Sequence, residues 1–148
     1  MVKFSINKPD KNKRYTQRIG AYAVITNNEN LIAIVKTETG YFLPGGGIEE
    51  DESLDECLKR ECLEELGMDI LIINKFAQGN YYFHSTTFNV DMESLGNFFT
   101  CKINNYLDIK TEVDHELVWF RPEKAIKLLY LDNQKESLRI FSKIRVLI

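Results

Sequence analysis

Hydrophobic residues near the start of the chain fall into short runs that are typical of β-strands. β-branched and aromatic residues fill the run from Ile19 to Ile25, and the polar turn Asn27–Asn30 separates it from a second apolar run, Leu31 to Val35. Runs of this kind, bounded by turn residues, predict two strands that form a hairpin. A third short strand is expected from Tyr41 to Pro44, where the proline should end it.

The apolar spacing changes from two residues to about 3.6 between Ser53 and Leu66, which predicts a helix. Ser53 can cap the N-terminus of this helix, and Glu56, three residues later, completes a capping box. Gly67 stands just past the last helical residue, where a glycine commonly ends a helix.

Beyond Gly67, the sequence predicts four further strands and two closing helices. Before the first strand, it predicts a polar N-terminal arm or a short edge strand. Strands, one central helix, more strands and two helices form an α+β (mixed α/β) order, with too few crossover helices for a doubly wound sheet. We treat residues 1–148 as a single domain. The arm is Met1 to Arg14; the strands are Ile70 to Phe76, Tyr81 to His84, Gly96 to Ile103 and Val118 to Phe120; the helices run from Pro122 to about Leu129 and from Asn133 to Ile144.

Composition narrows the class of protein. The chain has 148 residues, of which 44% are hydrophobic and 28% charged, as in folded globular proteins rather than disordered ones. The sequence contains no apolar run near the roughly 18 residues of a membrane-spanning helix and no signal-peptide core at its start, so we expect a cytosolic protein. The net charge of −3 argues against a nucleic-acid polymer as partner.

The cysteines do not predict a disulfide framework or a zinc site. Cys57 and Cys62 lie five residues apart on the predicted helix and point away from each other. Neither has a histidine at metal-ligand spacing. We expect these two residues and Cys101 to be reduced and packed in the core.

The carboxylates of the predicted helix do not form a solvated face. On a helical wheel of about 100° per residue, Leu54, Leu58, Cys62 and Leu66 form the apolar stripe. Glu65 falls inside this stripe and Glu61 at its margin, while Arg60 points roughly 80° away from Glu61. Like charges four residues apart repel, so a positive partner is needed.

A divalent cation suits this need better than Arg60 does, because clustered carboxylate oxygens are ligands that Mg²⁺ and Mn²⁺ prefer. The alternative is a helix that is merely rich in acidic residues. Gly45, Gly46 and Gly47 precede the helix and would let the backbone approach a ligand closely. The loop lacks the Gly-Lys-Ser/Thr ending of a P-loop.

The spacing of these residues resembles the Nudix box of the Nudix hydrolases (MutT-like). Gly46 is followed after five residues by Glu52 and after seven more by Arg60-Glu61-Cys62-Leu63-Glu64-Glu65-Leu66-Gly67-Met68. Two positions depart mildly from the pattern: Cys62 replaces a bulky aliphatic residue, and Asp51 replaces a frequent glycine.

The resemblance implies a Nudix-like α/β/α sandwich with a mixed central sheet, covering nearly the whole chain. It also implies hydrolysis of the diphosphate linkage of a nucleoside diphosphate joined to another moiety, with Mg²⁺ or Mn²⁺ as cofactor. A small-molecule nucleotide is then the substrate, and homodimers are common in the family. A non-catalytic Nudix-like regulatory module that binds a nucleotide or metabolite, and an enzyme that destroys oxidised nucleoside triphosphates, are the alternatives.

The resemblance also gives roles to individual residues. Arg60 would orient the glutamates, and Glu52 would hold Arg60 or an outer metal. Glu61 is favoured as the residue that activates water. The implied metal ligands are Glu61, Glu64, Glu65, the Gly45 carbonyl and, from a late loop, Glu116, with Asp114 and Glu112 behind it.

Substrate contacts are expected outside the Nudix box. Arg18 and Lys36 flank the first two strands and are candidates for phosphate contacts, and Tyr22 and Tyr81 are candidates for stacking on a base. Strand aromatics more often belong to the core. The two histidines, His84 and His115, have no sequence partner that defines a role, although His115 stands beside Glu116.

Overall fold

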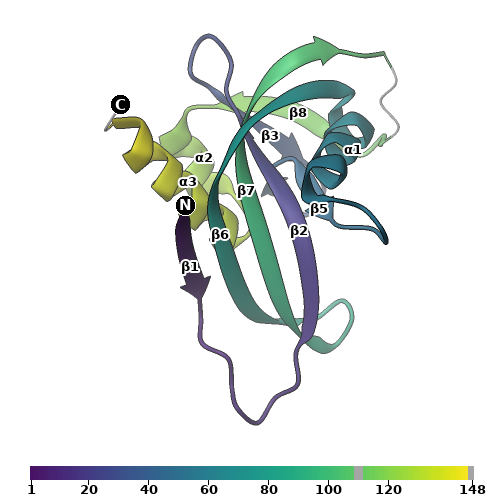
Figure 1. Cartoon of the computed structure of the whole chain (residues 1–148), viewed down its shortest axis with the longest axis vertical. Coiled ribbons are helices and arrows are strands. Elements are labelled where there is room, and N and C mark those ends of the chain that lie inside the picture. Colours follow the sequence, from purple (N-terminus) through teal and green to yellow (C-terminus); the bar gives the residue numbers. More distant parts are fainter. Residues whose placement is uncertain (109–111, 147–148) are drawn as a thin grey trace.

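In a computed structural model, residues 1–108 and 112–146 are described, and these form eight strands and three helices (Figure 1). No helix in these residues is long and apolar enough to cross a membrane. The strands are β1 (Val2–Ile6), β2 (Thr16–Ile25), β3 (Ile32–Lys36), β4 (Tyr41–Phe42), β5 (Gly45–Gly47), β6 (Met68–Ser85), β7 (Val90–Tyr106) and β8 (Glu116–Phe120); the helices are α1 (Leu54–Leu66), α2 (Pro122–Leu128) and α3 (Asp132–Val146).

The described strands form two sheets. The larger has the order β1-β6-β7-β2-β5 and is mixed: β1 pairs with β6 and β2 with β7 in parallel, whereas β6 with β7 and β2 with β5 are antiparallel. The smaller has the order β4-β3-β8. The prediction of a mixed α/β fold with a mixed central sheet is confirmed.

Helices cover the sheets from two sides, α1 from one and α2 with α3 from the other (Figure 1). One apolar core lies under α1, and the other lies under α2 and α3. β3 separates them: Ala33 and Val35 belong to the core under α1, and Ile32 and Ile34 to the other. Side chains alternate between the faces of a strand, so one apolar strand serves both cores. The predicted α/β/α sandwich is confirmed.

The predicted hairpin of the first two long strands is wrong. β2 lies in the larger sheet and β3 in the smaller, and a single bridge between Thr26 and Ile32 joins them. β7 pairs with β2 along its whole length, and β5 pairs with its other edge from Gly20 to Tyr22. Because both edges of β2 are occupied there, β3 pairs with β4 and β8 instead.

Two other strand predictions need correction. The strands expected at 70–76 and 81–84 are parts of one long strand, β6, whose pairing with β7 shifts register three times between Asp69 and Ala77. β7 is also longer than the expected 96–103. The N-terminal arm does contain an edge strand, β1, as predicted. All three cysteines are buried and free, which confirms their assignment as reduced core residues.

Candidate functional site

The helix α1 is fixed at both ends by the predicted caps. The Ser53 side chain accepts from the Glu56 N–H at 3.1 Å, and Glu56 Oε1 accepts from the Ser53 N–H at 3.1 Å. Gly67 ends the helix in the left-handed conformation, with φ of 62°. α1 has no basic residue in its last turn, where the helix dipole favours cations. Its carboxylates there must therefore be balanced by groups from elsewhere.

Glu65 and Glu61 lie where the helical wheel places them, against the core rather than in solvent. Glu65 is only 7% exposed, and burial raises its pKa to about 8 although the Gly45 N–H donates to Oε1 at 2.8 Å. Burial also raises the pKa of Glu61, against the opposing effect of Arg60. A carboxylate in a poorly hydrated place is costly to ionise unless a cation is near.

Arg60 joins the carboxylates of this region. Its Nη1 lies 3.1 Å from Glu61 Oε1 and 3.2 Å from Glu64 Oε2. Its Nε donates to Glu52 Oε2 at 2.6 Å, and this bond lowers the pKa of Glu52 to about 2. Nη2 also reaches the Gly47 carbonyl at 3.2 Å. Nη1 also lies 3.6 Å from Oε1 of the exposed Glu49, so the guanidinium connects four glutamates with the glycine loop.

The helical wheel suggests that Arg60 points away from Glu61, but the two side chains are in contact. The angle describes where the side chain leaves the helix, whereas the long arginine stem bends so that its planar head reaches neighbours on several sides. The contacts implied by the family resemblance, Arg60 with Glu61 and with Glu52, are present.

The glycine loop lies directly against the carboxylates. A Cβ at Gly46 would lie 2.6 Å from Glu61 Oε1, so a side chain at position 46 would displace the Glu61 carboxylate. Gly45 meets the cluster through its N–H, which donates to Glu65. Its carbonyl as a metal ligand stays a prediction.

The segment before β8 brings two more polar side chains to Glu65. His115 Nδ1 lies 3.2 Å from Glu65 Oε2, and His115 Nε2 lies 3.5 Å from Glu112 Oε2. The Glu112 N–H donates to the Glu64 carbonyl at 3.2 Å, so the segment also docks on α1 through its main chain. The sequence names both residues but gives them no partner, because the contact joins segments about fifty residues apart.

Glu116, the predicted ligand from this region, does not join the cluster. It begins β8 opposite Lys36, and alternation places its side chain on the same face as Val118 and Phe120. Those two residues pack in the core under α2 and α3, whereas Leu117 and Trp119 face α1. The alternation could not be read from the sequence because both faces of β8 are apolar.

The candidate ligand atoms are of the chemical type that binds a hard divalent cation. Glu61, Glu64 and Glu65 supply carboxylate oxygens, with one guanidinium between them, and oxygen ligands are what Mg²⁺ and Mn²⁺ prefer. In residues 1–108 and 112–146, no three His, Cys, Asp or Glu side chains converge as they stand on a point that could hold an ion. Arg60 Nη1 contacts both Glu61 and Glu64 and so occupies the space between them.

Two of the four tentative substrate residues line pockets that adjoin the site. Arg18 lines a pocket of about 360 Å³ that includes Gly47, and Lys36 lines one of about 310 Å³ that includes both His115 and Glu116. The other two lie in aromatic pairs. Tyr22 lies opposite Gly45 and close to the carboxylates, because burial raises its pKa and the charges of Glu61 and Glu65 add to this effect. The ring of Tyr22 stacks on Phe98 with centroids 5.6 Å apart, and that of Tyr81 stacks on Phe83 at 4.7 Å.

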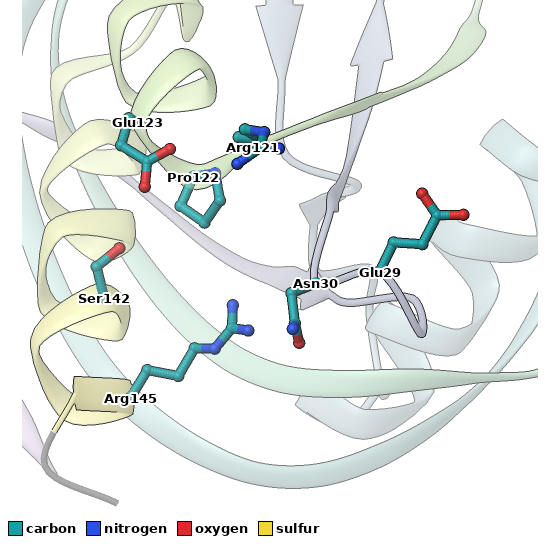
Figure 2. A pocket seen from close by; sticks show the side chains of 7 residues that line it. All are labelled: Glu29, Asn30, Arg121, Pro122, Glu123, Ser142 and Arg145. Carbon is teal, nitrogen blue, oxygen red and sulfur yellow. The ribbon is translucent and has the colours of Figure 1, made fainter.

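Another pocket, of about 410 Å³, lies at the far end of the smaller sheet (Figure 2). Arg145 and Arg121 extend into it, but Glu29 and Glu123 also line it, so its formal charge balances. It contains no residue of the carboxylate cluster. The second histidine, His84, lies 3.0 Å from Asp91 Oδ1 near the tip of the β6–β7 hairpin, which is a structural contact. The carboxylate cluster is therefore the candidate site.

Comparisons with known proteins identify the family and the fold. The family described as NUDIX domain matches residues 16–141. Among solved structures, a NUDIX hydrolase from Nitrosomonas europaea is 17% identical, with 86% of this chain and 90% of that chain covered and a TM-score of 0.70. The MutT protein from Methanosarcina mazei Go1 is 22% identical, with 88% and 96% covered and a TM-score of 0.71.

A third structure, the E. coli dihydroneopterin triphosphate pyrophosphohydrolase, is 15% identical, with 87% of this chain and 97% of that chain covered and a TM-score of 0.69. At these identities the likeness establishes the fold. No curated protein matches the sequence.

Proposed function

The chain belongs to the NUDIX domain family, and from that membership we propose that it is a metal-dependent pyrophosphohydrolase acting on a nucleoside diphosphate derivative. The observation that carries the proposal is the contact of one guanidinium, Arg60, with Glu61 and Glu64 beside the buried carboxylate of Glu65. Such a concentration of charge at the core margin is costly to fold and has a clear use in phosphate chemistry.

The carboxylates would hold a divalent cation that, when bound, neutralises diphosphate oxygens and makes a water more acidic. Glu61, Glu64 and Glu65 are the proposed ligands, and Mg²⁺ or Mn²⁺ the proposed ion. The Gly45 carbonyl belongs to the same proposal. Arg60 holds Glu61 and Glu64 in place through charged hydrogen bonds and is itself held by Glu52 at 2.6 Å.

Glu61 is the proposed general base. Burial raises its pKa, and a carboxylate with a raised pKa accepts a proton from water more readily than an exposed one. Arg60 opposes this effect by favouring the ionised form, which is the form that can accept a proton. Water that has lost its proton to Glu61 attacks phosphorus in line with the departing phosphate oxygen, and two phosphate products result.

The substrate is proposed to lie between the two adjoining pockets. Arg18, beside Gly47, supplies a cationic side chain next to the cluster. Lys36 lies opposite Glu116 and lines the pocket that also includes His115, and its contact with phosphate belongs to the same proposal. Cationic donors bind phosphate oxygens strongly, and arginine can do so with two parallel bonds. A cytosolic location and a homodimer stay predictions, as does stacking of a base on Tyr22 or Tyr81.

The test is release of phosphate or nucleoside monophosphate with Mg²⁺ or Mn²⁺ from nucleotide sugars, dinucleotides, ADP-ribose and nucleoside triphosphates. We expect at least one class to be cleaved, and cleavage to stop in EDTA. Glu61→Gln should lose most of the activity yet unfold at the wild-type temperature. Glu50→Gln, which removes an exposed carboxylate from the preceding loop, is the matched control.

Binding of the compounds without cleavage of any would overturn the enzymatic proposal and favour a regulatory nucleotide-binding module. Wild-type turnover by Glu61→Gln would overturn the assignment of the base alone.

A further inference from the structure

We propose that His115 is a positioning residue that fixes the Glu65 carboxylate, with Glu112 as its outer partner. The proposal rests on the proposed function of the carboxylate cluster. His115 reaches Glu65 from outside the Nudix box, on the segment that leads into β8.

Both oxygens of Glu65 have a partner from a different part of the chain. Oε1 accepts a hydrogen bond from the Gly45 N–H at 2.8 Å, and Oε2 lies 3.2 Å from His115 Nδ1 in an ion-pair contact whose angle is not that of a hydrogen bond. The carboxylate thus lies between the glycine loop and the segment before β8. One hydrogen bond and one ion-pair contact, on opposite oxygens, restrict the rotation of the carboxylate plane more than either would alone.

The other nitrogen of the ring is also engaged. His115 Nε2 lies 3.5 Å from Glu112 Oε2, three residues earlier in the chain. The Glu112 N–H donates at 3.2 Å to the carbonyl of Glu64, the neighbour of Glu65. The segment is therefore docked on α1 by its main chain, and the ring is held on the side away from Glu65. Partners of this kind commonly orient a catalytic carboxylate.

The opposite ends of the cluster have different supports. Arg60 contacts Glu61 and Glu64, and no contact between Arg60 and Glu65 occurs in the described residues. Glu65 is also a buried carboxylate, with 7% of its surface exposed. A group held so far from water needs a polar neighbour to adopt one orientation, and His115 provides it.

Two isosteric substitutions separate the two ring nitrogens. The amide nitrogen of asparagine lies near the place of Nδ1, and that of glutamine near the place of Nε2. His115→Asn should keep the contact with Glu65, whereas His115→Gln should keep only a contact with Glu112. His115→Ala removes both, and His84→Asn, at the distant hairpin, is the control.

The experiment measures the dissociation constant of Mn²⁺ from the substrate-free protein by the EPR signal of free ion, together with kcat and KM. We expect His115→Ala and His115→Gln to weaken Mn²⁺ binding and lower kcat by about 10- to 100-fold, with KM little changed. His115→Asn should stay within about threefold of wild type, and His84→Asn should match it. Thermal melting identifies any variant that does not fold, and the comparison then uses the Asn and Gln variants.

Wild-type ion binding and kcat in His115→Ala would overturn the proposal. Equal losses in His115→Asn and His115→Gln would also overturn it, as would a larger loss in His115→Asn. Either result would show that the contact through Nδ1 does not account for the effect of His115. If the wild-type protein itself cleaves no substrate, the proposed function fails, and the Mn²⁺ constants alone then decide whether His115 orders Glu65.

Discussion

Gly46 lies so close to Glu61 that a Cβ at position 46 would be 2.6 Å from Glu61 Oε1. The same oxygen is held from another side by Arg60 Nη1 at 3.1 Å. The carboxylate therefore cannot move aside without losing its guanidinium partner. Position 46 requires glycine for the space that it leaves to the proposed general base.

Gly46→Ala should displace the Glu61 carboxylate and lower kcat by about 100-fold, the size of loss expected when a general base is misplaced. Gly47→Ala is the matched control. Its Cβ would meet Arg18 Nε at 2.7 Å, but the guanidinium is at the free end of a flexible side chain and can move. Because Arg18 is a proposed phosphate contact, Gly47→Ala should raise KM and leave kcat near that of the wild type. Steady-state kinetics of the two variants provide the measurement, with thermal melting to confirm that both fold.

If Gly46→Ala and Gly47→Ala lose activity equally, the effect belongs to the loop as a whole. That result would contradict the prediction that glycine is required at position 46 to leave space for the Glu61 carboxylate.

The raised pKa of Glu65 predicts how stability depends on pH. Its pKa is about 8 in the folded protein against an ordinary value of 4.5, so between these values the native state binds more protons than the unfolded state. The free energy of unfolding of the metal-free protein should therefore fall as pH rises from about 4.5 to about 8. One proton limits this contribution to about 1.4 kcal/mol per pH unit.

Glu65→Gln should remove this contribution, because the amide has the same shape and cannot ionise. Urea unfolding in EDTA at pH 5.5 and pH 8.5 measures the change for both proteins. The low pKa of Glu52 acts in the opposite sense, but between about pH 2 and 4.5, outside this window. An unchanged difference between the two pH values in Glu65→Gln would show that Glu65 is not its source.

The two acidic residues near β8 should behave differently when neutralised. Glu116→Gln should leave kcat and the requirement for metal within about twofold of wild type, because Glu116 lies on the strand face turned away from α1. Since Glu116 lines the pocket that includes Lys36, an effect of this variant is expected in KM alone. Glu112→Gln should lower kcat by a few fold, because it weakens the contact with His115 at 3.5 Å. The comparison is made at a low Mg²⁺ concentration, where a loss of ion affinity is visible. A larger effect at Glu116 would reverse the assignment.

The sequence predicts local structure better than pairing. The caps of α1 follow from Ser53, Glu56 and Gly67 alone, because each acts on its immediate neighbours. The separation of β2 from β3 does not follow, because it depends on β7, about 70 residues further along the chain. An apolar pattern identifies a strand without identifying its partner.

The candidate site divides in the same way. The wheel places Glu61 and Glu65 at the core margin because the helical period is regular, and the structure agrees. The pattern does not show where a long side chain ends, as with Arg60. Nor does it show which face of a short strand is inward when both faces are apolar, as with Glu116. Both errors concern directions that only tertiary packing determines.

A row of glycines across the larger sheet is likewise invisible in the sequence. Register pairs Gly47 with Gly20, Gly20 with Gly96, and Gly96 with Gly79, which in turn lies opposite Phe4 on the edge strand β1. Aromatic rings lie over these bare positions and stack side by side: Phe4 over Gly79, Phe98 over Gly96 and Tyr22 over Gly20.

Gly79→Ala should therefore destabilise the protein by about 1–3 kcal/mol through overpacking, because its Cβ would overlap Phe4 Cζ. Without that clash, alanine within a strand is favoured over glycine by roughly 0.5–1 kcal/mol. In a Phe4→Ala background the same substitution should then be neutral or stabilising. Denaturant unfolding of the four proteins completes the cycle, and an equal cost of Gly79→Ala in both backgrounds would show that the ring is not what the glycine accommodates.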